Sequence, residues 1–351
     1  MPSTIPDGEQ RFRWLAVGTA VLTYLLILIG IYTATAGFGL TCEARWPVCD
    51  GAVFGLFPAN WGSFVEWFHR LVAMITGVAI LGLAGAAWRG GQSRRVRYAT
   101  AAAALVLPSQ IILGALTVTQ YELLILAAHF TTALLIFLPV TAVAVWALTG
   151  SDAVDARRLA VVAAVPPVAL ALFVAGATQA LDGASVVRTA VPLAAFALAT
   201  GLAVRALVDR SDRSRARTAL GGALPLLLLA SALTPGVVVA SLPATIAYYA
   251  ASLAALAALF AAALWLADGD AAGPLRRVRA VVAGAALALS LQLLLSRVWP
   301  IPDTDAVVLA LDLAVLAAAA LAFRWHSRLD RAEPPGGRPA GGTESSDRIA
   351  R

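Results

Sequence analysis

The sequence predicts an all-α integral membrane protein of about ten transmembrane helices, and three observations support this fold class. Of the 351 residues, 60% are hydrophobic and 13% are charged, whereas soluble domains are about 45–50% apolar and about 25% charged. Apolar runs long enough to cross about 30 Å of hydrocarbon recur along the chain. Arginines gather in alternate gaps between these runs, as the positive-inside rule requires. A soluble protein is therefore excluded, and the net charge of +6 indicates membrane topology rather than nucleic-acid binding.

Ten apolar runs define the expected spans. They cover residues 14–36, 62–88, 99–120, 122–148, 158–180, 186–208, 217–239, 244–266, 278–298 and 305–325. Strongly basic gaps alternate with gaps that hold only Arg45, Arg188 or Arg297. We therefore expect a multi-pass protein of a prokaryotic cell membrane, with both termini in the cytoplasm and the loop after the first span outside.

The loop after the first span holds both cysteines of the chain, Cys42 and Cys49. On an oxidising outer face, this pair can close a small disulfide loop that serves as a structural cross-link, or it can exchange with a redox partner. A zinc site is not expected, because no histidine or further cysteine accompanies the pair.

Two of the three histidines lie at matching depth inside expected spans. His69 is about one and a half turns into the second span, and His129 is about two turns into the fourth, counted from the outer surface. Polar side chains at membrane depth usually face a cavity, a partner or a cofactor. Two imidazoles from neighbouring helices could bind one haem iron from opposite sides, and a helix–helix hydrogen bond is the alternative for each. His326 follows the last span and is expected to be solvated.

An acidic and a basic residue accompany His69 in the segment Glu66-Trp67-Phe68-His69-Arg70. The spacing of three residues places Glu66 on the same helix face as His69, where a carboxyl group in a partly dry cavity could relay protons. Arg70 could pair with a haem propionate, because guanidinium groups bind carboxylates well. The alternative for Glu66 is an interfacial residue that pairs with Arg70.

These segments make the N-terminal part resemble the haem A synthase family, the membrane enzymes that convert haem O to haem A for terminal oxidases. The resemblance covers residues 14–148 and rests on four features in order: Thr33–Cys42 leading into Trp46–Gly51, Glu66–Arg70, Gln110–Thr117, and Ala128-His129-Phe130. It implies that His69 and His129 bind haem (haem O as substrate, or haem B), that Glu66 is needed for methyl oxidation, and that Cys42 and Cys49 form a disulfide.

A degenerate repeat of this four-helix half is expected at residues 158–266. Two short segments recur at the same offset: Leu107-Pro108 with Ala115-Leu116-Thr117, and Leu224-Pro225 with Ala232-Leu233-Thr234. The resulting alignment sets Tyr248 opposite His129 and Leu193 opposite His69. Both ligand positions are therefore lost, and no second haem is expected in this half.

Two additional spans at residues 278–325 follow the repeat, and a disordered cytoplasmic tail is expected at residues 327–351 because it is rich in Pro, Gly and charge. The buried polar candidates of the additional spans are Ser290, Gln292 and Asp312, for which we expect a role in helix packing.

Two functions from different classes follow. The first is an oxidoreductase that oxidises a methyl group of haem O to a formyl group, giving haem A for terminal oxidase assembly. The second is a non-catalytic haem carrier or oxidase assembly factor. Glu66 and the cysteines favour the enzyme, whereas the missing second histidine pair favours the carrier. A prenyltransferase is not expected, because the spans offer no D-x-x-x-D element to hold Mg²⁺ and pyrophosphate.

The expected partners follow from the resemblance. They are haem O, haem O synthase, terminal oxidase subunits, and a quinol or thiol redox partner. A homo-oligomer could supply the missing half-site.

Overall fold

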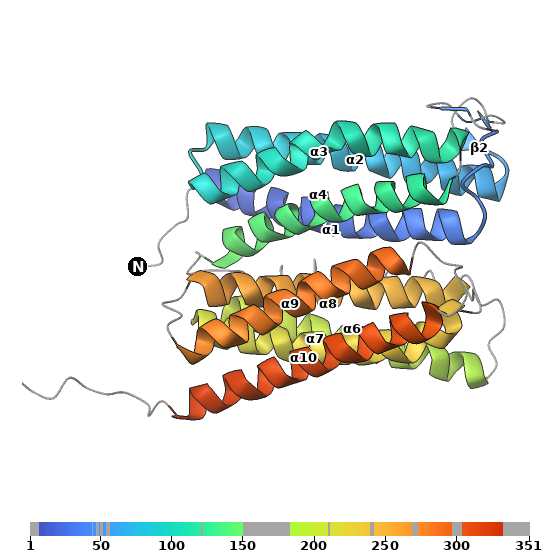
Figure 1. Cartoon of the computed structure of the whole chain (residues 1–351). Helices are drawn as coiled ribbons and strands as arrows, with labels where there is room; N and C mark the ends of the chain where they lie inside the picture. Colours follow the sequence, from blue (N-terminus) through green and yellow to red (C-terminus); the bar gives the residue numbers. More distant parts are fainter. Residues whose placement is uncertain are drawn as a thin grey trace, which may run out of the picture.

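The computed structural model describes residues 7–149, 183–238, 242–268, 273–296 and 304–332, apart from residues 44, 47–48, 50–51, 54–56, 121 and 210. The described residues form nine long helices that run alongside one another (Figure 1). Eight of these helices are long and apolar enough to cross a membrane. The all-α membrane fold is therefore confirmed. The expected span at 158–180 lies outside the described residues, so the total of ten stays a prediction.

The helices keep the order of the expected spans. They are α1 (Asp7–Thr35), α2 (Trp61–Arg89), α3 (Arg94–Thr119), α4 (Leu123–Thr149), α6 (Gly183–Val208), α7 (Asp212–Val238), α8 (Leu242–Asp268), α9 (Pro274–Leu295) and α10 (Thr304–Ala332). A two-residue strand pair, β1 (Ala52–Val53) with β2 (Phe57–Pro58), lies in the loop before α2.

Helices α1 to α4 form the N-terminal bundle. Helix α1 contacts α2 and α4, and α3 contacts the same two helices, so α2 and α4 lie diagonally across the bundle. Asn60 caps α2, because its Oδ1 accepts hydrogen bonds from the backbone of Gly62 at 2.9 Å and of Ser63 at 3.3 Å. This cap fixes the point at which the cysteine loop enters the membrane helix.

Helices α6 to α10 form the C-terminal bundle, which Figure 1 shows as a second layer beside the first. Helix α7 contacts α6, α8 and α10, and α9 contacts α8 and α10. Hydrogen bonds between described residues join the bundles. The Tyr24 hydroxyl donates to the carbonyl of Ala250 at 2.9 Å, and Trp265 Nε1 donates to Thr149 Oγ1 at 2.9 Å.

The last helix differs from the sequence-based expectation in two ways. Residues 327–332, expected in the disordered tail, continue α10 to Ala332, and Arg331 Nε donates to the Ser327 carbonyl at 3.1 Å. His326, expected to be solvated, is fully buried. It shares a helix face with the buried Ala319 and Ala322, and α10 packs against α7 and α9. Helix packing therefore overrides the solvation expected at a span end. Residues 333–351 lie outside the described part.

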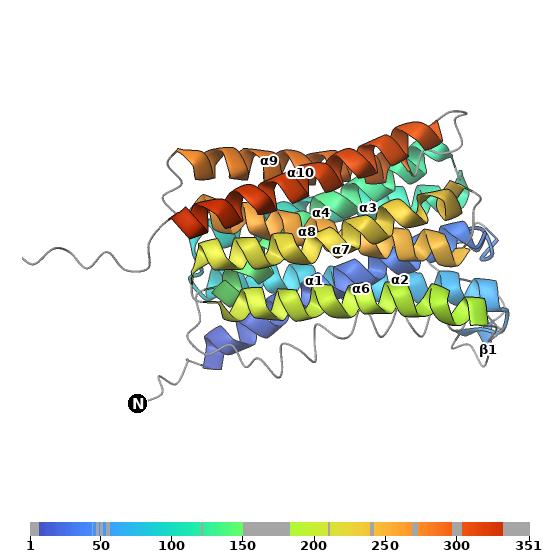
Figure 2. The ribbon, with the colours of Figure 1, turned by 90° about the horizontal axis from the view of Figure 1, so that it is seen from below.

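The first residues of α1 and the last residues of α10 lie at one end of the molecule, and β1 and β2 lie at the other (Figures 1 and 2). This arrangement matches the expected order of spans. The side of the membrane on which each end lies stays a prediction.

Candidate functional site

The two membrane-depth histidines lie in the first turns of diagonal helices. His69 is in the third turn of α2 and His129 is in the second turn of α4. Both helices begin at the end of the bundle that carries the cysteine loop, so the two side chains are at similar depth. They are near enough to influence each other electrostatically.

Each imidazole lies against a glycine of the preceding helix. A methyl group added to Gly30 of α1 would lie 3.0 Å from His69 Cε1, and one added to Gly114 of α3 would lie 3.2 Å from His129 Cε1. Real Cβ contacts are rarely so short, so both rings pack on the bare backbone of a neighbouring helix. The role of both glycines could not be predicted from the sequence, since only their contacts across helices reveal it.

These residues fit a haem ligated on both faces. Two imidazoles from diagonal helices are a suitable axial ligand pair. His69 Nδ1 is buried and has no hydrogen-bond partner among the described residues, and a buried polar atom normally has one. The two glycines provide space that any other side chain would fill. The donor set and the local packing therefore both suit the cofactor.

Glu66 ties the cysteine loop to α2. Its side chain is 3% exposed. Oε2 accepts hydrogen bonds from the Cys42 backbone N–H at 2.8 Å and from Thr41 Oγ1 at 3.1 Å, and Oε1 is paired with Arg70. Arg70 in turn donates to the Arg45 carbonyl at 2.8 Å. The ion pair given above as the alternative for Glu66 is therefore present, and the carboxylate also anchors the loop.

Cys42 and Cys49 form a disulfide, as the resemblance implies. Both residues are buried, and both sulfur atoms lie near the Ser63 carbonyl of α2, at 3.9 and 3.7 Å. The Ser63 hydroxyl donates to the Thr41 carbonyl at 2.9 Å. Burial against the start of α2 favours the structural cross-link over exchange with a redox partner.

A second interhelical contact lies near His129 and has no counterpart in the sequence analysis. Thr132, almost one turn further along α4, donates from Oγ1 to Gln110 Oε1 of α3. This bond fixes α4 against the helix that carries Gly114. Gln110 belongs to the segment that carries the resemblance, but its partner could not be identified from spacing alone.

Tyr248 has the same position within α8 as His129 has within α4. Each is the seventh residue of its helix. Tyr248 is fully buried, and its hydroxyl oxygen accepts a hydrogen bond from Gln292 Nε2 at 2.9 Å. The side chain of Leu193 and the span expected at 158–180 lie outside the described residues, so the lack of a second haem stays a prediction.

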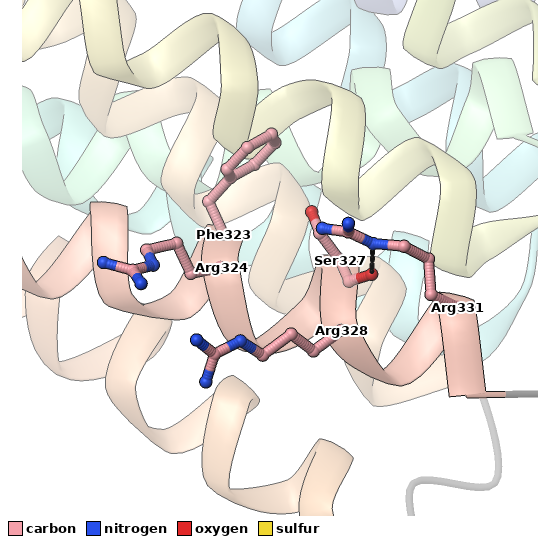
Figure 3. Close-up of a pocket in the computed structure, with 5 residues that line it drawn as sticks. All are labelled: Phe323, Arg324, Ser327, Arg328 and Arg331. Carbon is pink, nitrogen blue, oxygen red and sulfur yellow. Dashed lines mark hydrogen bonds between the residues drawn. The ribbon is translucent and has the colours of Figure 1, made fainter.

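An open cavity of about 510 Å³ lies away from the histidines, at the far end of α10 (Figure 3). Its lining consists of Phe323, Arg324, Ser327, Arg328 and Arg331. This lining contains no histidine and offers no iron ligand, so the cavity is separate from the candidate site.

Comparisons with known proteins found relatives that carry two different names. The chain is 36% identical over 147 residues to a protein named protoheme IX farnesyltransferase from Haloarcula marismortui. This match covers 41% of this chain and 31% of that protein. It is 30% identical over 131 residues to a heme A synthase from Bacillus licheniformis, covering 37% of this chain and 43% of the relative. A heme A synthase from Alkalihalophilus pseudofirmus is 33% identical over 126 residues, covering 35% and 41%.

The matches span less than half the length of each of these relatives. No family model and no solved structure matches the sequence. The chain is therefore a membrane-spanning protein that is similar, over about two fifths of its length, to proteins named for heme A synthesis and for farnesyl transfer to protoheme IX.

Proposed function

We propose that this protein is a membrane oxidoreductase that converts a methyl group of haem O to a formyl group and so produces haem A. The observation that carries the proposal is the pair His69 and His129, which project from diagonal helices at similar depth, each against a glycine backbone. The similarity to proteins named heme A synthase supports the same activity.

In this proposal His69 and His129 hold the haem iron, which supplies the redox chemistry when bound. Gly30 and Gly114 let the two rings lie against α1 and α3, so the backbone limits how far each imidazole can move. The disulfide loop is held against the start of α2 by Glu66 and by the contact of both sulfur atoms with the Ser63 carbonyl.

Arg70 and Glu66 act together at the loop. Arg70 holds Oε1 of Glu66 and the Arg45 carbonyl. Arg70 could instead hold a haem propionate, and Oε1 of Glu66 would then be able to bind a proton, as a general acid–base group requires. Oxidation of a methyl to a formyl group replaces two hydrogens by one oxygen; with water as the source of this oxygen, four electrons and four protons are released. We assign these electrons to a separate redox partner of the quinone or disulfide class, which is reduced to a quinol or a dithiol.

The first test is haem retention in the purified protein. His69→Ala and His129→Ala should each abolish or strongly reduce bound haem in the optical spectrum and after pyridine extraction. His326→Gln is the control. His326 is also a buried histidine of a membrane helix, but it lies in α10 of the C-terminal bundle, away from His69 and His129. Loss of haem in the control alone, with both other variants unchanged, would show that the site is misassigned.

Glu66→Gln separates the enzyme from a haem carrier. If Glu66 handles a proton, the variant should keep haem and lose haem A production in membranes, because an amide has no acid proton to exchange. Thr41→Ala is the control, since it removes one donor to Glu66 and leaves the carboxyl group in place. Normal haem A yield in Glu66→Gln would favour the carrier, in which Glu66 only anchors the loop.

The relatives named protoheme IX farnesyltransferase give a competing activity. Two assays of the purified protein distinguish farnesyl transfer from oxidation. One supplies haem B and farnesyl diphosphate, the other supplies haem O and an electron acceptor, and the mass of the product identifies the activity. We favour oxidation, because the described spans bring two histidines together. Among the described residues, no group of three His, Cys, Asp or Glu is placed to hold a metal ion such as the Mg²⁺ of a diphosphate site.

A further inference from the structure

A buried polar cluster joins four helices of the C-terminal bundle. It consists of Thr234 of α7, Tyr248 of α8, Gln292 of α9 and Asp312 of α10, and we call it the Asp312 cluster. None of the four residues is more than 3% exposed. Burying polar side chains inside a membrane bundle costs free energy unless they form hydrogen bonds with one another. The hydrogen bonds within the Asp312 cluster therefore indicate what it does.

Asp312 is the centre of the cluster. Thr234 Oγ1 donates to Asp312 Oδ2 at 2.6 Å, and Gln292 Nε2 donates to Asp312 Oδ1. The same amide nitrogen donates to the Tyr248 hydroxyl oxygen at 2.9 Å. All three neighbours are neutral. In the part of the chain that the structure describes, no arginine or histidine forms an ion pair with Asp312.

A carboxylate in these surroundings would be a buried charge without a counter-ion. Burial of an unpaired charge is strongly unfavourable, and such a group takes up a proton instead. The carboxylic acid form also gives Asp312 a hydrogen to donate. The burial and the neutral neighbours therefore both favour the protonated side chain.

The Gln292 amide supplies an acceptor for this proton. As placed, its Oε1 is buried without a hydrogen-bond partner. The oxygen and nitrogen of an amide are assigned from the bonding network. A half-turn of the Gln292 amide puts Oε1 beside Asp312 and Tyr248 and puts Nε2 in the position that Oε1 now has. Gln292 Oε1 then accepts one hydrogen bond from protonated Asp312 and another from the Tyr248 hydroxyl. Both acidic hydrogens have an acceptor in this arrangement.

The cluster lies at the depth of the histidine pair. Tyr248 has the same helix position in α8 as His129 has in α4. The Tyr248 ring contacts Tyr249 edge-on at 5.3 Å between centroids, and Tyr249 contacts Phe130, the neighbour of His129, at 5.9 Å. Among the described residues of the packed helices, Tyr248 is the titratable group placed beside Asp312, and the Tyr249 hydroxyl is paired with Ser296 instead.

We propose that Asp312 is a proton-binding site inside the membrane and that the neutral acid holds α7, α8, α9 and α10 together. Loss of the proton would leave an uncompensated charge among the four helices and loosen the bundle. This inference does not depend on the haem chemistry, because none of its residues belongs to the N-terminal bundle. The opposing possibility is an ionised Asp312 that binds a sodium ion with the oxygens of its neighbours.

Infrared spectroscopy of the full-length protein tests the protonation directly. We expect a C=O stretching band of a protonated carboxylic acid at neutral pH, shifted by deuterium exchange and lost in Asp312→Asn. Loss of the band in Asp312→Asn assigns it to Asp312 rather than to Glu66 or another carboxyl group. Ser290→Ala is the matched control, since Ser290 lies on α9 and bonds only to its own helix through the Ala286 carbonyl. Absence of the band in the wild-type protein overturns the proposal.

Thermal unfolding in detergent provides the second readout. The wild-type protein should lose stability as the pH rises into the alkaline range, whereas Asp312→Asn, which cannot ionise, should lose this dependence. Wild-type stability that requires sodium rather than choline, with no acid band, would establish the cation site instead. If Asp312→Asn does not fold, Thr234→Val keeps the acid and removes one donor, and it should shift the infrared band without abolishing it. An unshifted band in Thr234→Val contradicts the cluster.

Discussion

At the residue scale, one missing methyl group decides how closely each candidate ligand approaches a helix backbone. Gly30 and Gly114 lie directly against His69 and His129. The histidines and Glu66 could be predicted from the sequence, because polar groups in apolar spans stand out. The two glycines could not, because a glycine within a span is common and its neighbour on another helix is set only by packing.

Gly30→Ala and Gly114→Ala should each displace an imidazole and lower haem retention. The added methyl group is closer than ordinary contact, and overpacking of this kind costs about 1–3 kcal/mol. Haem content and the optical spectrum of the purified variants measure the effect. Gly18→Ala is the control on the same helix as Gly30, because its added methyl group meets no atom within 4 Å. Equal haem content in all three variants would mean that the glycines do not position the ligands.

At the element scale, apolar run length predicts most of the membrane helices. The expected span at 62–88 corresponds to α2 at Trp61–Arg89, and that at 122–148 corresponds to α4 at Leu123–Thr149. The end of α10 was predicted wrongly, because composition gives no sign that residues 327–332 continue the helix. The cysteine loop is a further element whose contacts could not be predicted, since Glu66 meets the Cys42 backbone only after folding.

Replacing both cysteines by serine should lower the unfolding temperature but leave haem bound. A loop this short gains about 2–3 kcal/mol from its disulfide in the chain-entropy model. The bonds from Cys42 N–H to Glu66 and from Ser63 to Thr41 involve no sulfur and should still hold the loop. Thermal unfolding and haem spectra of the double variant test this expectation. Complete loss of haem would show that the loop depends on the disulfide alone.

At the scale of the whole molecule, two bundles lie side by side, and hydrogen bonds between described residues connect them. The Tyr24–Ala250 bond and the Trp265–Thr149 bond connect helices far apart in the sequence. The faint internal repeat predicts two related halves, but the sequence does not show which helices meet. The first residues of α1 and the last residues of α10 lie at one end of the molecule, which agrees with the alternation of arginines along the sequence.

The membrane orientation should follow these arginines. A fluorescent-protein fusion after residue 351 should fluoresce and lie in the cytoplasm, and the segment around Arg45 should be accessible to a membrane-impermeant reagent from outside after substitution by a reactive residue. Arg324, Arg328 and Arg331 at the end of α10 favour this orientation, because positive charges are retained on the cytoplasmic side. Labelling of the loop only in inverted vesicles would reverse the assignment.

If His69 and His129 hold an iron as proposed, the contact of each ring with a bare helix backbone should make that site sensitive to the lipid around it. His69 rests on α1 and His129 rests on α3, so any change in tilt of these two helices moves a ring directly, with no flexible side chain between them to absorb the shift. Bilayers of different thickness alter the tilt of membrane helices. The ligand-field strength at a bound iron should therefore differ between thin and thick membranes. The optical absorption spectrum of the bound haem would then change with bilayer thickness.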